Sequence, residues 1–242
     1  MHSKDGAPRP SATVVLVRPG PGAPEILMVK RHARTAFGSA YAFPGGVLEP
    51  ADRRVGDRCR DLGDAEASRI LDLPAGGLAY YSAAIRELFE ETGVLLAAPD
   101  PGPERCAAAR AALNAGRLGW DRFVADAELE LCCGDLSYIG FWITPEGEPK
   151  RFSARFFLAR LPDGQAAAHC GGEITDSCWM PAAEILAARA QGAMRLIYPT
   201  RKTLETLATF DAVDPMLAWA RECAASGRVV CDRPTRAEAG LG

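Results

Sequence analysis

The stretch that most constrains this chain runs from Arg86 to Val94 and reads RELFEETGV. At about 100° per residue of an α-helix, Glu87, Glu90 and Glu91 fall on one side, and most of the apolar residues fall on the other. One face can pack on a core while the other presents three carboxylates. Because like charges three and four residues apart repel, that face costs helix stability. A hard cation such as Mg²⁺ or Mn²⁺ would offset the repulsion, and a solvated acidic surface is the alternative.

A second stretch, FPGGVLEPAD, runs from Phe43 to Asp52. Together the two stretches resemble the Nudix box, G-x5-E-x7-R-E-U-x-E-E-x-G-U, in which U is an aliphatic residue. Gly46 matches the leading glycine, and every fixed position of the second half is matched from Arg86 onward. Asp52 stands where the pattern has glutamate, and residues 53–85 separate it from Arg86 where the pattern has seven residues. The sequence therefore resembles a Nudix box that is split by an insertion.

The resemblance covers about residues 11–210 and implies the Nudix fold, an α/β arrangement in which a mixed β-sheet is sandwiched between α-helices. Two mainly helical insertions are expected at about residues 53–79 and 99–133, and a C-terminal helix and tail at 211–242. The apolar periodicity and the turn residues predict the individual elements. Strands are predicted over residues 12–18, 25–31, 136–144, 151–161 and 173–180, and helices over residues 64–71, 78–92, 103–115, 121–131, 181–190, 200–210 and 215–226.

The same resemblance implies that the box holds a divalent cation, Mg²⁺ or Mn²⁺, for hydrolysis of a phosphoric anhydride. Such a cation neutralises charge on the phosphate oxygens and acidifies the attacking water. The implied metal ligands are Glu87, Glu90 and Glu91, with the backbone of Gly46 close to the metal. Arg86 is expected to hold the box carboxylates by charge-assisted hydrogen bonds. The general base is left open between a box glutamate and Glu173.

The split box resembles the branch of the family that contains coenzyme A and acyl-CoA diphosphatases. Matches to that branch continue at residues 142–145 (WITP) and 198–200 (YPT). The implied reaction is cleavage of the diphosphate of coenzyme A or acyl-CoA to 3′,5′-ADP and (acyl-)phosphopantetheine. Some relatives place an arginine and a glycine at set distances before FPGG, whereas this chain has Arg31, Arg34 and Gly38 in a different register. An ADP-ribose or dinucleotide pyrophosphatase is therefore the alternative.

Four arginines are candidates for contact with the phosphates of a substrate. Arg31 and Arg34 form a positive cluster at the end of a predicted strand, and solvated strand-edge charge is the alternative reading. Arg151 and Arg155 lie in a later strand between aromatic residues. These two either face phosphate or stack on the neighbouring rings, because a guanidinium binds well to either partner.

Composition narrows the class of protein further. The chain has 242 residues, of which 48% are hydrophobic, so it can build one sizeable core. A net charge of −3 provides no overall attraction to nucleic acid or to a membrane. The first residues lack the apolar segment of a secretory signal, and no apolar run approaches membrane-spanning length. We expect a cytoplasmic protein that binds a small-molecule pyrophosphate substrate, and the sequence leaves a homodimer open.

A Nudix module that senses a nucleotide without cleaving it is the hypothesis from another class. Such modules typically lose one or more box glutamates. This chain retains Arg86, Glu87, Glu90 and Glu91. The sequence therefore favours an enzyme, a Nudix hydrolase, over a sensor.

Overall fold

The main sheet is organised around β1 (Arg9–Arg18), which is paired along both edges. The computed structural model describes residues 6–31, 40–168 and 174–239. In this sheet β1 runs parallel to β9 and antiparallel to β2 and β4, so the sheet is mixed. Its path is β10-β2-β1-β9-β8-β11, and β3 and β4 pair beside it. The strands are β2 (Glu25–Arg31), β3 (Tyr41–Ala42), β4 (Gly45–Val47), β8 (Ser137–Ile143), β9 (Phe152–Arg160), β10 (Ile174–Pro181) and β11 (Val230–Asp232).

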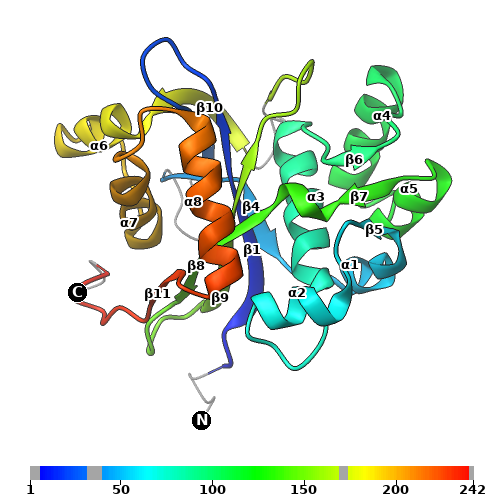
Figure 1. The fold of residues 1–242 in the computed structure, drawn as a ribbon, viewed down its shortest axis with the longest axis horizontal. Coiled ribbons are helices and arrows are strands. Elements are labelled where there is room, and N and C mark those ends of the chain that lie inside the picture. The colour runs from blue at the N-terminus through cyan, green and yellow to red at the C-terminus, as the bar shows by residue number, and fades with distance from the viewer. Residues whose placement is uncertain (1–5, 32–39, 169–173, 240–242) are drawn as a thin grey trace.

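Helices cover both faces of this sheet (Figure 1). On one side lie α1 (Pro50–Arg54), α2 (Asp64–Ile70), α3 (Leu78–Thr92), α4 (Pro103–Asn114) and α5 (Trp120–Asp126). On the other lie α6 (Ala182–Ala190), α7 (Tyr198–Leu207) and α8 (Val213–Ser226). The alternation of side chains along β1 explains both contacts, because Val14 and Leu16 join the core under α3 while Val15 and Val17 join the core under α6–α8. The predicted α/β fold with a mixed sheet between helices is confirmed.

A second, three-stranded sheet joins the two predicted insertions. Its order is β5-β7-β6, formed by β5 (Cys59–Arg60), β7 (Glu130–Cys132) and β6 (Ala97–Ala98). Short 3₁₀ turns at Gly56–Arg58 and Cys133–Asp135 flank it. The helix predicted over residues 121–131 was too long, because the chain takes a positive φ of 51° at Glu128 after α5 ends and then extends into β7.

Several predicted bounds shift by a few residues at the C-terminal end. Helix α8 starts at Val213 with Ala212 as its N-cap, so Asp214 lies in the first turn instead of capping the helix. Strand β11 had no sequence prediction and pairs in parallel with β8. Helix α8, in the segment 211–242 that was expected to form a C-terminal helix and tail, adds buried residues to the core under α6–α8. The domain limits themselves stay predictions. Within the described residues, no helix combines the length and the apolar character needed to span a membrane.

Candidate functional site

The box glutamates lie at the C-terminal end of helix α3, as the sequence predicted. This end of the helix faces β4, the strand that contains Gly45 and Gly46. The bounds of α3, Leu78–Thr92, agree with the predicted 78–92, and Gly93 closes it in the left-handed conformation with φ of 80°. Because α3 packs on β1 and β4 pairs with β1, the end of the helix lies beside Gly45 and Gly46. The fold thus reunites the two halves of the split box.

Arg86 connects the two halves of the box, and its side chain is only 2% exposed. Its Nε and Nη2 donate to Oδ1 and Oδ2 of Asp52 at 2.9 and 3.0 Å. Its Nη1 donates to Glu87 Oε1 at 2.9 Å and to Glu90 Oε2 at 3.2 Å. Nη2 also donates to the carbonyl of Val47 at 2.9 Å, next to the glycine pair. One guanidinium therefore ties α1, α3 and β4 together, which fits the holding role that the sequence implied for it.

Asp52 occupies the place of the family's glutamate and is fully buried. Helix α1 brings it there, since a capping box forms between Glu49 and Asp52 and the Glu49 amide donates to Asp52 Oδ2 at 2.7 Å. Ser82 Oγ on α3 lies 3.4 Å from Oδ1. Because the insertion begins only after Asp52, the position of this carboxylate does not depend on the length of the insertion.

The two glycines of β4 allow the box carboxylates to approach the backbone. The Gly45 amide donates to Glu91 Oε2 at 3.1 Å. A Cβ placed on Gly46 would lie 2.3 Å from Glu87 Oε1, closer than atoms can pack. Only glycine fits at this position while the Glu87 carboxylate stays in place.

The second insertion holds the far end of the box helix. Arg110 on α4 donates to the carbonyls of Glu90 at 3.0 Å, of Glu91 at 2.6 Å and of Ala168 at 2.7 Å. Asn114 Nδ2 donates to the Glu90 carbonyl at 3.1 Å. These bonds satisfy carbonyl groups that a helix end leaves without intrahelical partners. Sequence reasoning missed Arg110, which is one of two arginines in the alanine-rich helix α4.

The electrostatics of the box favour a bound cation. Burial raises the pKa of Glu90 to about 7, Arg86 opposes the rise, and the charges of Glu87 and Glu49 add to it. The carboxylates that share Arg86 therefore outnumber the positive charge available to them. A bound cation would supply the positive charge that the carboxylates at this end of α3 lack.

The fit to a metal is good in ligand type and incomplete in geometry. Carboxylate oxygens on one helix end, beside a glycine backbone, are the ligands that Mg²⁺ and Mn²⁺ prefer. However, no group of three or more Asp, Glu, His or Cys side chains is gathered as a metal site in residues 6–31, 40–168 and 174–239. The carboxylates of Glu87 and Glu90 turn to Arg86, and that of Glu91 turns to the Gly45 amide. The predicted ligands share one end of the helix without converging on one point.

The other predicted site residues lie in different surroundings. Arg34 and Glu173 fall outside the described residues, as does the side chain of Arg31. Arg151 Nε donates to the Thr144 carbonyl at 3.2 Å, beside the β8–β9 turn. The roles proposed for these four residues stay predictions.

Arg155 is buried on the α3 side of the sheet, with an exposed fraction of 5%. Its guanidinium carbon lies 4.4 Å from the ring centroid of Tyr80 and 4.7 Å from that of Phe141, and Nη2 donates to the Leu71 carbonyl at 3.1 Å. This is the stacking that the sequence offered as the alternative to phosphate contact. A phosphate could reach Arg155 only if the stack opened, so a phosphate-binding role for it stays a prediction without support from this geometry.

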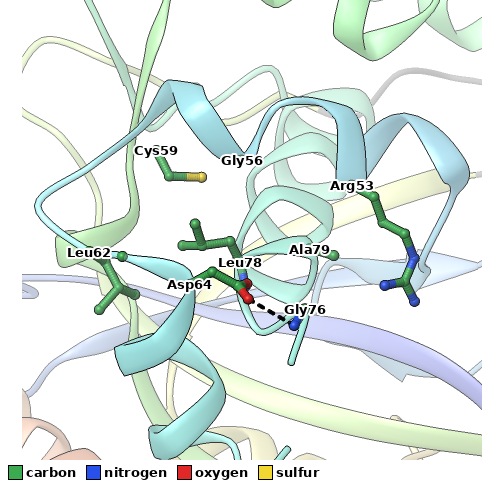
Figure 2. Close-up of a pocket in the computed structure, with 9 residues that line it drawn as sticks. Arg53, Gly56, Cys59, Leu62, Asp64, Gly76, Leu78 and Ala79 are labelled. Atoms are coloured by element: carbon green, nitrogen blue, oxygen red, sulfur yellow. Dashed lines mark hydrogen bonds between the residues drawn. The ribbon is translucent and has the colours of Figure 1, made fainter. Parts of the chain in front are cut away.

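Two cavities accompany the box. One of about 430 Å³ lies on the α6–α8 side of the sheet and is bordered by Gly45 and Gly46. The other, of about 490 Å³, lies between the first insertion and the start of α3 and includes Cys59 and Leu78 (Figure 2). Since a helix rises about 1.5 Å per residue, this second cavity is roughly 13 Å from Glu87 along α3. The cavity beside the glycine pair is therefore the candidate substrate site.

The second cavity shows how the first insertion supports α3. Asp64 Oδ2 accepts a hydrogen bond from the Gly76 amide at 2.9 Å, drawn in Figure 2, and Oδ1 accepts one from the Leu78 amide at 3.0 Å. These amides lower the pKa of Asp64. Ser68 Oγ accepts from the Gly77 amide at 2.9 Å. Side chains of the insertion thus cap the N-terminus of the box helix.

A mixed sheet between helices, with an R-E-x-x-E-E helix end set against a Gly-Gly strand, defines a fold and site of the Nudix type. Residues 7–105 match the family model for the NUDIX domain. Over this region the chain is similar to the Nudix superfamily, and its split box resembles the coenzyme A-type branch.

Three relatives illustrate the likeness. The chain is 31% identical over 188 residues to acyl-coenzyme A diphosphatase NUDT19 of Gallus gallus, covering 59% of this chain and 50% of that protein. It is 27% identical over 156 residues to putative nudix hydrolase 7 of Caenorhabditis elegans, covering 64% of this chain and 46% of that protein. The crystal structure of a NUDIX hydrolase from Alicyclobacillus acidocaldarius superposes with a TM-score of 0.70 at 25% identity, covering 88% of this chain and 96% of that one. The chain spans about half the length of the two curated relatives.

Proposed function

We propose that this chain is a divalent-metal-dependent pyrophosphohydrolase that cleaves the diphosphate of coenzyme A or acyl-CoA to 3′,5′-ADP and (acyl-)phosphopantetheine. The observation that carries the proposal is the reassembly of the two box halves across the insertion. Arg86 is shared by Asp52, Glu87 and Glu90, and Glu91 reaches the Gly45 amide. A buried cluster in which carboxylates outnumber positive charge costs stability, so its retention suits a catalytic role better than a structural one.

The residues divide the work of hydrolysis between them. Glu87, Glu90 and Glu91, with the backbone of Gly46, would hold Mg²⁺ or Mn²⁺. The ion would supply charge neutralisation on the phosphate oxygens and a water of lowered pKa. With Glu87 and Glu90 holding the ion, Arg86 would still have its two bonds to Asp52 and its bond to the Val47 carbonyl, which would keep β4 beside α3. The base that accepts the proton of the water is one of the box glutamates or Glu173.

Two observations support the coenzyme A branch. The box is split, and the chain is 31% identical over 188 residues to a protein named as an acyl-coenzyme A diphosphatase. The different register of Arg31 and Arg34 before FPGG favours the second candidate, a pyrophosphatase for ADP-ribose or dinucleotides. A nucleotide sensor without catalysis is third, because all four charged residues of the second box half are retained.

A substrate panel with Mg²⁺ and with Mn²⁺ tests the proposal. It would contain coenzyme A, acetyl-CoA, longer acyl-CoAs, ADP-ribose, NADH and diadenosine polyphosphates, with products resolved by mass and Glu91→Gln as the inactive control. Release of 3′,5′-ADP by the wild type alone supports both the activity and the branch. AMP from ADP-ribose or NADH, with coenzyme A untouched, retains the enzyme and rejects the branch. Metal-dependent binding of a ligand with no turnover rejects the hydrolase.

The remaining expectations are also proposals. The substrate is a small molecule that carries a pyrophosphate, and neither nucleic acid nor a membrane is a proposed partner. A cytoplasmic location and a homodimer stay predictions.

A further inference from the structure

The cavity beside Gly45 and Gly46 contains features that the box chemistry does not use. It lies on the α6–α8 side of the sheet and has a volume of about 430 Å³. Its aromatic lining consists of Phe43, Trp142, Phe152, Phe156 and Tyr198. This volume is near the lower end for small-molecule sites, so it suits a nucleoside better than a whole coenzyme A molecule.

Three arginines line the same cavity and give it positive charge. The guanidinium of Arg201 already has partners within the protein, because it forms an ion pair with Glu205 and its central carbon lies 5.1 Å from the ring centroid of Tyr198. Arg189, in the last turn of α6, and Arg195, in the loop before α7, form no ion pair with any described residue, and both are exposed. Two guanidinium groups are therefore available to an anion.

The single carboxylate among the described lining residues does not neutralise them. Glu238 Oε2 accepts hydrogen bonds from the Thr235 amide at 2.9 Å and from Thr235 Oγ1 at 2.8 Å. These bonds lower the pKa of Glu238 and keep its carboxylate in a local turn. The charge of the lining remains positive, so an anionic ligand is favoured over a neutral one.

The ring of Trp142 forms part of the cavity wall, while its Nε1 lies beside Gly140, outside the lining. Trp142 is 2% exposed, and its Nε1 has no hydrogen-bond partner among the described residues. Its ring meets that of Tyr198 edge-on at 5.9 Å. Helix α7 starts at this point without a side-chain cap. At this point the wall therefore offers a ligand the aromatic surface of Trp142 and Tyr198 and the N-terminus of α7.

We propose that this cavity binds the nucleoside end of the substrate, and that Arg195, with Arg189, binds a phosphomonoester that the nucleotide carries in addition to the scissile diphosphate. The inference rests on the proposed function for the position of that diphosphate, beside Gly46. Guanidinium groups suit this role because their fork matches phosphate geometry.

Chain geometry limits how far Arg195 can lie from the glycine pair. The Arg195 carbonyl accepts a hydrogen bond from the Tyr41 amide at 2.9 Å. Tyr41 lies four residues before Gly45, and an extended chain of that length spans at most ~14 Å. The backbone of Arg195 and the glycine pair are therefore anchored within the reach of a nucleotide that bears phosphates at both its 5′ and 3′ positions.

The experiment compares binding of 3′,5′-ADP and of 5′-AMP by calorimetry without metal, so that it does not depend on hydrolysis. The wild type should bind 3′,5′-ADP roughly 10–100-fold more tightly than AMP, the usual contribution of hydrogen bonds to a charged group. Arg195→Gln should reduce this ratio, and Arg189→Gln/Arg195→Gln should bring it close to one, with AMP affinity unchanged. Arg117→Gln, which replaces an exposed arginine outside the cavity, should keep the wild-type ratio.

Three results would overturn the proposal: a wild-type ratio near one, an unchanged ratio in the double variant, or no binding of either nucleotide. A fourth result would also overturn it: the double variant loses affinity for 4′-phosphopantetheine but keeps the ratio of 3′,5′-ADP to AMP affinity. The cavity would then bind the pantetheine end of the substrate and not the nucleoside end. Failure of the proposed function is visible separately, because an intact ratio with no cleavage of coenzyme A supports the nucleotide site and rejects the hydrolase.

Discussion

Asp52 provides a direct test of the view that a buried ion pair joins the two halves of the box. Replacing one partner of a buried pair costs about 3–5 kcal/mol, because the remaining charge is left uncompensated. Arg86 would retain its bonds to Glu87, Glu90 and the Val47 carbonyl, so we place Asp52→Ala near the lower end, at ~3 kcal/mol. Loss of the capping box of α1 adds ~1 kcal/mol. The expected total is ~4 kcal/mol.

Urea unfolding measures this cost. With a slope of ~3 kcal/mol per molar urea for a chain of this size, the midpoint should fall by about 1 M. Asp57→Ala is the matched control, since Asp57 is exposed in the turn that follows α1, and it should change the free energy of unfolding by less than ~0.5 kcal/mol. A loss of under ~1 kcal/mol in Asp52→Ala would refute the reasoning.

The variant Asp52→Glu separates charge from shape at the same position. It restores the residue of the family pattern and keeps the carboxylate, but it adds a methylene to a fully enclosed site. Overpacking of this kind costs ~1–3 kcal/mol. The midpoint of Asp52→Glu should therefore lie between those of the wild type and Asp52→Ala. A midpoint at or below that of Asp52→Ala would mean that steric fit, and not the charge, dominates at this position.

Three further variants follow from the contacts of the box helix. Gly46→Ala should lower kcat/KM about 100-fold, because the added Cβ pushes the Glu87 carboxylate aside. Gly63→Ala is the control and should leave kcat/KM unchanged, since a Cβ there meets no atom within 4 Å. Equal effects of the two variants would contradict the close approach of Glu87 to Gly46. Arg110→Ala should weaken metal affinity roughly 10–100-fold because the carbonyls of Glu90 and Glu91 each lose one donor, and Arg110→Lys should recover part of it. Lower stability at unchanged metal affinity would reduce Arg110 to a structural role. Two backbone amides lower the pKa of Asp64 from its ordinary 3.8. The free energy of unfolding of the wild type should therefore exceed that of Asp64→Asn above about pH 4, and the difference should disappear below that pH. A difference that does not depend on pH would contradict the role of the Asp64 carboxylate as acceptor for these amides.

Local signals explain which elements could be predicted from sequence. The bounds of α3 followed from its apolar period and from Gly93, which can take the left-handed conformation that ends a helix. Strands β7 and β11 have three residues each and are defined by partners distant in the chain, so no local pattern indicates them. The helix that ran past Asp126 in the prediction failed for the same reason, because pairing with β5 and β6 decides the conformation of residues 130–132.

Residue identities in the site could be predicted, whereas orientations could not. The pattern singled out Arg86 and the box glutamates, but only packing shows that Arg86 is shared among three carboxylates. Arg155 shows the limit most clearly. A strand that alternates between aromatic and basic residues is compatible with phosphate contact or with stacking, and the position of Tyr80 on α3 decides for stacking.

The insertion that splits the box is tolerated because both of its ends are fixed. Residues 53–85 replace a spacer of seven residues, a little over two doublings in length, which costs roughly 1.4 kcal/mol in loop-closure entropy. The Asp64 bonds to the start of α3 are contacts of the kind that contribute ~1 kcal/mol at a helix N-terminus, and they exist only because the insertion is present. Ser68 adds a buried bond to the Gly77 amide. The insertion thus supplies most of the stability that its length removes, and Asp52 and Arg86 meet as if the spacer were short.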